Sequence, residues 1–191
     1  MSKLHNVRGR ITYISSHAKQ ENLYAVYETI DRHYWTELAR FNQQEFLKSG
    51  TKGECIEARE LIIALPESFP DLYDPDRLLQ LFTNRFTEKY GVECVSALHH
   101  NKRKTNYHIH LIFSERELLP KPIEKFATRN MFYNEQKKHV RTKKEILDDR
   151  GNVRKGCKII KKGEVYERTL FTAKNKLFKQ EHYLDCKFRL I

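Results

Sequence analysis

Four of the nine histidines lie within residues 97–113, ALHHNKRKTNYHIHLIF, and two of them alternate with apolar residues. On a β-strand, residues two apart project from the same face, so His108 and His110 point the same way. Paired imidazoles on a rigid strand are typical ligands of a divalent cation, and a catalytic site needs a third protein ligand. His99 and His100 stand just across a predicted turn. Since the sequence does not determine the conformation of that turn, both are candidates for the third ligand.

Other chemistries fit this pattern less well. The spacing differs from the helical HExxH motif, and no ordered set of carboxylates accompanies the histidines, which disfavours a two-metal nuclease. The four cysteines are scattered at positions 55, 94, 157 and 186 and match neither a zinc ribbon nor a disulfide framework. Alternatively, the histidines are ordinary polar residues on a solvent-exposed strand face. An alternating pair with a third histidine across a turn favours the metal site.

The histidines need a β-hairpin to bring them together, and the surrounding sequence predicts one. β-Strand patterns occur at residues 9–16, 55–66, 92–100 and 107–115, and the polar stretch NKRKTN separates the last two. Residues 31–50 and 74–91 predict helices, because each begins with Asp, ends with Gly and carries apolar residues at helical spacing. The order β-α-β-α-β-β predicts an α+β fold: an antiparallel sheet of about five strands flanked by helices, with these helices on one face.

Charge is distributed unevenly along the chain. Residues 1–119 hold 16 basic and 16 acidic side chains, whereas residues 120–191 hold 20 basic and 9 acidic ones, so the net charge of +11 lies in the last 72 residues. Basic segments of this kind typically bind phosphate, although they also serve solubility alone. We predict a histidine-bearing part over residues 1–120 and a basic, DNA-contacting extension over residues 121–191. The extension is expected to form a hairpin or extended arm with a sparse core and a short final helix.

Particular basic side chains are candidates for DNA contact. They lie at the tip of the histidine hairpin and in the basic extension: Lys102, Arg103, Lys104, Lys143 and Lys144. The most apolar stretch, LIIALP, is too short to span a bilayer, and MSKLHNVRGR has no apolar signal region. We therefore expect a soluble protein of a reducing cytoplasm, without membrane insertion.

Four stretches in order resemble a known family. HIHL after an upstream histidine resembles the HUH motif, and the chain resembles conjugative relaxases of the MobA/MobL type in RGRITYISS, HYWTELA, ARELIIALPESF and ALHHNKRKTNYHIHLIFSER. The resemblance runs from about residue 7 to residue 117. It implies an HUH relaxase-like fold, related to ferredoxin and RRM folds, in a bacterial cytoplasmic enzyme that nicks one strand of transfer-origin DNA. In such enzymes a tyrosine attacks the scissile phosphate and stays joined to the 5′ end, and the strand is later rejoined.

The resemblance also implies roles for individual residues. Tyr13 in TYIS corresponds to the nucleophile, and the paired histidines correspond to two ligands of a single divalent ion, for which Mn²⁺ or Mg²⁺ is expected. The third ligand is His100 or His99. His99 follows an aliphatic residue, as in the family, whereas His100 leaves the shorter turn, and we prefer His100. On composition alone, other tyrosines compete for the nucleophile's role: Tyr24, Tyr27 and Tyr34.

Two glutamates on the strand at residues 55–66 are candidates to orient a ligand histidine. A carboxylate that accepts the second ring N–H of such a histidine fixes its tautomer and orientation. Glu57 and Glu60 are both placed to do this, and we prefer Glu60. The alternative is a salt bridge to Arg59 or a side chain in solvent.

The expected partners follow from the same resemblance. They are single-stranded or hairpin DNA at a transfer origin, accessory mobilization proteins and a conjugative coupling protein, with the chain itself a monomer. Two other functions are compatible with the sequence. One is an HUH-type replication initiator or transposase with the same tyrosine chemistry, and the other is a non-catalytic basic nucleic-acid-binding module whose histidines are structural.

Overall fold

The chain divides into two compact units in a computed structural model that describes residues 1–19, 21–68, 72–101, 103 and 105–179. The first unit comprises Met1–Leu118 together with the described residues that follow Leu170, and the second comprises Leu119–Leu170. The predicted boundary at residue 120 lies close to the point where the chain leaves the first unit. The return of the chain to that unit at Phe171 was not predicted.

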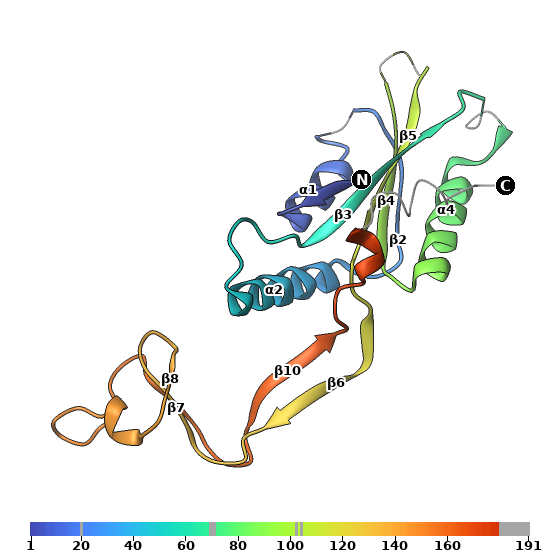
Figure 1. Cartoon of the computed structure of the whole chain (residues 1–191). Coiled ribbons are helices and arrows are strands. Elements are labelled where there is room, and N and C mark those ends of the chain that lie inside the picture. The colour runs from blue at the N-terminus through green and yellow to red at the C-terminus, as the bar shows by residue number, and fades with distance from the viewer. Residues whose placement is uncertain (20, 69–71, 102, 104, 180–191) are drawn as a thin grey trace. The chain divides into compact units, whose positions relative to one another are not determined.

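The first unit is built on a five-stranded sheet in which all neighbouring strands are antiparallel (Figure 1). Its strands, in the spatial order β1-β3-β5-β4-β2, are β1 (Ser2–Leu4), β3 (Ala58–Leu65), β5 (Tyr107–Phe113), β4 (Cys94–His100) and β2 (Leu23–Glu28). The predicted α+β fold with an antiparallel sheet of about five strands is confirmed. β4 and β5 are the two strands of the predicted histidine hairpin, and β3 and β5 are neighbours.

Two helices begin and end at the residues that the sequence indicates. In α2 (Arg32–Ser49), the Asp31 side chain accepts hydrogen bonds from the first backbone amides, and Gly50 ends the helix with φ 64°. In α4 (Pro75–Tyr90), Asp74 caps the start and Gly91 ends the helix with φ 65°. A residue with an L side chain rarely adopts this left-handed conformation, which explains why a glycine follows the C-terminal end of each helix.

The segment at residues 9–16, predicted as a strand, is instead mostly part of a helix, α1 (Val7–Ile14). Its β-branched residues suggested a strand, but Val7, Ile11 and Ile14 are the buried ones, and their spacing of four and three is helical. The Asn6 side chain caps the helix by accepting a hydrogen bond from Gly9 N at 2.9 Å. Tertiary burial of this apolar stripe outweighs the strand propensity.

Helices lie on both faces of the sheet, which corrects the expectation that they share one face (Figure 1). α4 packs on the face formed by the buried side chains of Leu98, Ile109 and Phe113. Side chains alternate along each strand, so His99 projects from the opposite face, where it contacts the backbone of Ile14 in α1. The histidine face is therefore covered in part by α1.

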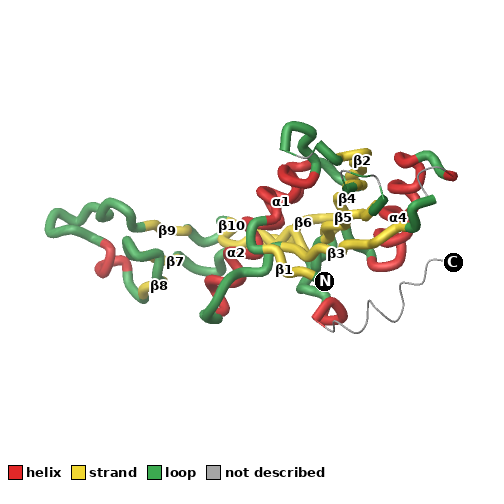
Figure 2. Tube along the Cα trace, turned by 90° about the horizontal axis from the view of Figure 1, so that it is seen from above, coloured by secondary structure: helices red, strands yellow, loops and turns green. Residues whose placement is uncertain are grey.

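The second unit has little buried core, as expected for an arm. A two-stranded sheet joins β6 (Leu118–Phe126) to β10 (Val165–Phe171), and a three-stranded sheet has the order β8 (His139–Val140), β7 (Met131–Tyr133), β9 (Lys158–Ile160). A 3-10 helix, η1, spans Lys143–Ile146. Figure 2 shows that loops and turns make up much of this unit. Its buried hydrophobic side chains are Ala127, Ile146 and Ile160.

After Leu170 the chain packs onto the first unit. Thr172 N donates to Glu117 O at 3.0 Å, and Asn175 N donates to Glu115 O at 2.8 Å. The short 3-10 helix η2 (Lys176–Lys179) inserts the fully buried Phe178 against Phe113, with ring centroids 5.0 Å apart. Part of the predicted final helix thus exists as η2, and the rest of that prediction lies outside the described residues.

Candidate metal centre

Three histidines of the hairpin project from one face of the sheet. His99 pairs directly with His108 across β4 and β5, and Ala97 pairs with His110, so the side chains of all three histidines lie on the same side. One ring nitrogen from each histidine lies within 4.8 Å of the others. Three imidazoles this close together could hold one metal ion.

His100 is not part of this group, which corrects our preference for it. It pairs with Tyr107 on the opposite face, and its ring packs edge-on against Tyr24 with centroids 5.7 Å apart. Its Nδ1 lies 2.7 Å from Asn101 O. The two strands pair without a bulge from Cys94 to His100, so strand alternation selects His99 and excludes His100.

Hydrogen bonds fix the tautomers of two of the three histidines. His99 Nε2 lies 2.7 Å from Ile14 O, and a carbonyl only accepts, so Nε2 carries the proton and Nδ1 has the free lone pair. His110 Nδ1 lies 2.8 Å from Glu60 Oε1, so Nδ1 donates and Nε2 has the free lone pair. Metal-ligating histidines typically have such a partner on the ring nitrogen that faces away from the ion.

Electrostatics favour the neutral, ligand-competent form of this group. Burial lowers the pKa of His99, although the hydrogen bond to Ile14 O acts in the opposite direction. Burial, followed by the positive charge of His110 and His100, lowers the pKa of His108. Because a metal ion competes with protons for imidazole, lowered pKa values extend the pH range in which these side chains can bind one.

Glu60 connects His110 to helix α1. Its carboxylate is buried and accepts from Arg10 Nη2 at 2.8 Å and Nε at 3.0 Å, besides His110. Burial raises the pKa of Glu60, but the hydrogen bonds from His110 and Arg10 outweigh it and hold the pKa below its usual value. Arg10 Nη2 also lies 3.4 Å from His110 Nδ1, but both atoms are donors, so Arg10 acts on the histidine through the carboxylate.

Glu57, the other glutamate considered, has a different environment. Its Oε2 accepts from the backbone amide of Val7 at 2.9 Å, and its Oε1 accepts from Gln43 Nε2 at 2.9 Å. Glu57 therefore anchors the first turn of α1 and joins it to α2. Of the two candidates, the structure brings only Glu60 into contact with a histidine.

Tyr13 lies on α1, close in sequence to two residues that contact the histidine group. Ile14, its neighbour, accepts from His99, and Arg10, one turn earlier, places its guanidinium carbon 5.4 Å from the centroid of the Tyr13 ring. The Tyr13 side chain is 47% exposed, which leaves it accessible to a substrate. Arg10 was missed in the sequence because its spacing of three from Tyr13 has meaning on a helix and not on the predicted strand.

The competing tyrosines are engaged elsewhere. Tyr34 is buried and donates to Ser114 Oγ at 3.1 Å, and burial raises its pKa well above the usual value. Tyr27 donates to Asn84 Oδ1 at 3.0 Å. Tyr24 packs against Tyr107 and the excluded histidine, on the face opposite to the histidine group.

The basic candidates divide between the two units. Arg103 is exposed in the turn of the histidine hairpin, whereas Lys102 and Lys104 lie outside the described residues. Lys143 and Lys144 are exposed on η1 of the second unit. That unit, residues 119–170, holds 15 basic and 7 acidic side chains, an excess of eight positive charges.

The fold is α+β with an antiparallel sheet, three histidines converge on one face of that sheet, and a neighbouring helix carries an exposed tyrosine. These features define a candidate metal-dependent enzyme of the HUH type. The chain belongs to the MobA/MobL family, whose model matches residues 12–183. Membership implies a mobilization relaxase, a nuclease of the DNA-relaxase type that binds DNA at an origin of transfer. No curated protein and no solved structure matches the chain. Among the described residues, no helix has the length and apolar character needed to cross a membrane.

Proposed function

We propose that this protein is a conjugative relaxase that nicks one strand of transfer-origin DNA with Tyr13 as the nucleophile. The observation that carries the proposal is the double attachment of helix α1 to the histidine group. Ile14 contacts His99 directly, and Arg10 reaches the other strand of the hairpin through Glu60. These contacts come from residues on either side of Tyr13 in the sequence, so they attach the part of α1 that carries this tyrosine to the face from which the three histidines project.

The residues that would hold the ion are His99 through Nδ1, His110 through Nε2, and His108. When bound there, a divalent ion such as Mn²⁺ or Mg²⁺ supplies positive charge to phosphate oxygens as negative charge builds on them. Ile14 O and Glu60 keep two of the imidazoles in the required tautomer. The lowered pKa of Glu60 keeps it ionised, so it remains an acceptor for His110 at neutral pH.

The proposed reaction is a transesterification. The Tyr13 oxygen attacks the phosphorus, the 3′ oxygen of the neighbouring nucleotide leaves, and the 5′ phosphate remains esterified to the tyrosine. One phosphoester bond replaces another, so attack by a 3′ hydroxyl on the phosphotyrosine rejoins the strand. A neutral phenol is a poor nucleophile, and the Arg10 guanidinium, 5.4 Å from the centroid of the Tyr13 ring, places a positive charge close to this side chain.

Basic side chains near α1 support a DNA strand at this position. A hollow of about 200 Å³ between α1 and α2 is lined by Arg8, Thr12, Arg32 and Thr36, all of which can donate hydrogen bonds to phosphate oxygens. In the second unit, the basic excess that includes Lys143 and Lys144 would add affinity that weakens with salt. Accessory mobilization proteins and a coupling protein remain the expected protein partners, and a monomer the expected active form.

The test is relaxation of a supercoiled plasmid that carries the DNA flanking the gene for this protein. We expect nicking by the wild-type protein with Mn²⁺ and none with EDTA. Tyr13→Phe should abolish nicking while retaining metal and DNA binding, and Tyr24→Phe, at an exposed tyrosine on the other face, should nick like the wild type. DNA binding without nicking by the wild-type protein under every divalent ion tried would favour a non-catalytic binding module.

A further inference from the structure

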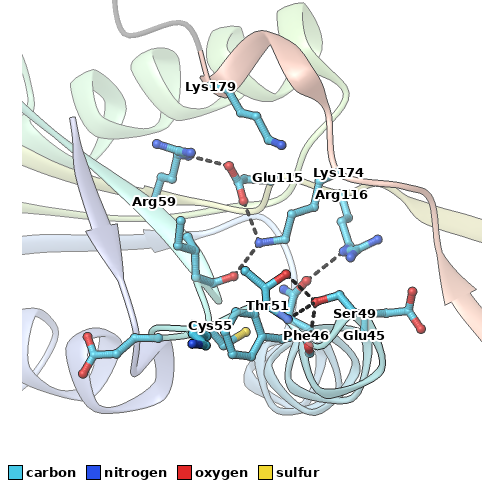
Figure 3. Close-up of a pocket in the computed structure, with 14 residues that line it drawn as sticks. Glu45, Phe46, Ser49, Thr51, Cys55, Arg59, Glu115, Arg116, Lys174 and Lys179 are labelled. Carbon is cyan, nitrogen blue, oxygen red and sulfur yellow. Dashed lines mark hydrogen bonds and ion pairs between the residues drawn. The ribbon is translucent and has the colours of Figure 1, made fainter.

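The first unit has a second concave site, away from the histidine group. It is a pocket of about 450 Å³ between the end of α2, the loop that leads into β3, and the returning segment from Lys174 to Lys179 (Figure 3). Arg59 lines it from β3, and the neighbouring residue on that strand, Glu60, contacts His110. Successive strand residues project from opposite faces, so the pocket and the histidine group lie on opposite faces of β3.

Positive charge in this pocket is only partly neutralised. Figure 3 shows Arg59, Glu115 and Lys174 joined by polar contacts, with Arg116 beside them. Glu115 accepts from Arg59 Nε at 2.5 Å and from Lys174 Nζ at 2.8 Å, so one carboxylate serves two cations. Among the described residues, the Arg116 guanidinium donates only to neutral acceptors, Asn42 Oδ1 at 2.8 Å and Thr172 O at 2.7 Å.

Burial makes this imbalance costly. Arg59, Glu115 and Arg116 have only 4%, 3% and 8% of their surfaces exposed, respectively. A buried cation that forms no direct ion pair is destabilised unless an anion approaches it. Burial lowers the pKa of Arg116, and the negative charges of Glu45 and Glu115 offset this effect only in part.

The acidic residues at the rim only partly correct the imbalance, because the pocket is lined by five cations, Lys52, Arg59, Arg116, Lys174 and Lys179, and by three carboxylates, Glu45, Glu54 and Glu115. Glu45 pairs with Lys48 at 3.1 Å, outside the pocket lining, and its charge also acts on Arg116, whereas Glu54 lies 3.6 Å from the ring of His5. By contrast, the other two cations of the rim, Lys52 and Lys179, have no ion-pair partner within the part of the chain that the structure describes.

The remaining hydrogen-bond donors suit a tetrahedral oxyanion. Arg59 uses only Nε in its described hydrogen bonds, which leaves both η nitrogens, and Arg116 has one η nitrogen left. Lys52 and Lys179 add two ammonium groups at the rim. Forked guanidinium donors together with lysine ammonium groups are the typical recognition set for phosphate.

We propose that this pocket binds a phosphate group through Arg59, Arg116, Lys52 and Lys179. The phosphate belongs either to a DNA backbone or to a small phosphate ester, two sources that share this chemistry. These four side chains come from β3, the loop after α2, the segment after β5 and the returning segment, so a bound phosphate would tie these parts together. The proposal does not rest on nicking by Tyr13, since none of these four side chains contacts α1 or the histidine group in the described structure.

The experiment measures binding of inorganic phosphate, adenosine monophosphate and a single-stranded oligonucleotide to the full chain by calorimetry, in EDTA and at constant ionic strength. Lys52→Gln and Lys179→Gln remove exposed charges at the rim, and Lys176→Gln is the matched control, because Lys176 is exposed on the same 3-10 helix but does not line the pocket. Arg59→Lys keeps the charge and removes the forked donor. Thermal unfolding of each variant verifies its fold.

We expect each rim variant to weaken binding roughly tenfold, the usual effect of losing one charge-assisted hydrogen bond, and the control to bind like the wild type. If phosphate and the nucleotide bind and are weakened, the occupant is a small phosphate ester. If only the oligonucleotide binds and is weakened, the occupant is the DNA backbone. Rim variants that bind all three probes as tightly as the control, or a wild-type protein that binds none, would overturn the proposal.

Discussion

Substitution of Glu60 by Gln should weaken metal binding and should also lower the free energy of unfolding. The carboxylate accepts three hydrogen bonds from Arg10 and one from His110, and its side chain is 4% exposed. Glutamine has the same length but carries no charge, and its single carbonyl oxygen cannot replace both carboxylate oxygens. The substitution therefore removes the charged link between α1 and the histidine group while it preserves volume.

The magnitude follows from burial. Breaking a buried ion pair costs about 3–5 kcal/mol, and an exposed pair contributes about 0–1 kcal/mol. The Arg10 side chain is 29% exposed, and glutamine retains one acceptor, so we expect a loss of about 1–3 kcal/mol in the free energy of unfolding. Loss of a charged partner behind a ligand histidine typically lowers metal affinity by about 10–100-fold.

The assay combines calorimetric titration with Mn²⁺ or Co²⁺ and urea unfolding in EDTA. Glu57→Gln is the matched control, because Glu57 is also buried and also contacts α1, but it does not contact a histidine. It should lose stability while its metal affinity stays close to that of the wild type. Equal metal affinity of Glu60→Gln and the wild type, or an equal loss in both variants, would refute the orienting role of Glu60.

Three further predictions test the geometry. His99→Ala should abolish metal binding in the same calorimetric titration and His100→Ala should retain it, because only His99 shares the face of the other two histidines; the reverse result would restore the original preference. The pKa values of Glu60 and Glu115 are held below the usual value, so their stabilisation is present above about pH 4.5 and is lost as the pH falls through their lowered values. Urea unfolding from pH 7 to 3 should therefore show an acid loss that is smaller in Glu60→Gln and Glu115→Gln, and unchanged curves would contradict this. Phe178→Ala should lower the free energy of unfolding by about 3–5 kcal/mol, since this ring is fully buried in the core of the first unit; a loss under 1 kcal/mol, typical of a surface site, would show that the returning segment is dispensable.

The parts of the fold that the sequence predicted are those with strong local signals. The caps of α2 and α4 are local, and so is the alternation that places His108 and His110 on one face of their strand. The choice of His99 depended on an unbroken register between two strands, which no local pattern encodes. α1 was misread because its apolar residues fit a strand as well as a helix over so short a length.

The long-range features were out of reach for a different reason. The return of the chain at Phe171 and the cluster around Glu115 join residues more than fifty positions apart. In the sequence, Ser114, Glu115 and Arg116 were recognised only as the last three residues of the stretch ALHHNKRKTNYHIHLIFSER. Their contacts with the returning segment depend on the fold of the whole first unit.

The central claim is that Tyr13 becomes joined to the 5′ end of the nicked strand, and mass mapping of the covalent complex tests it most directly. The wild-type protein is incubated with Mn²⁺ and single-stranded DNA from the region flanking its gene, and the denatured product is digested with nuclease and trypsin. Cleavage after Arg10 and Lys19 releases the peptide ITYISSHAK, in which Tyr13 is the only tyrosine. We expect this peptide to carry a nucleotide that is joined to Tyr13 through its 5′ phosphate. A modified peptide that contains Tyr24 and Tyr27 instead, or nicking without any covalent adduct, would contradict it.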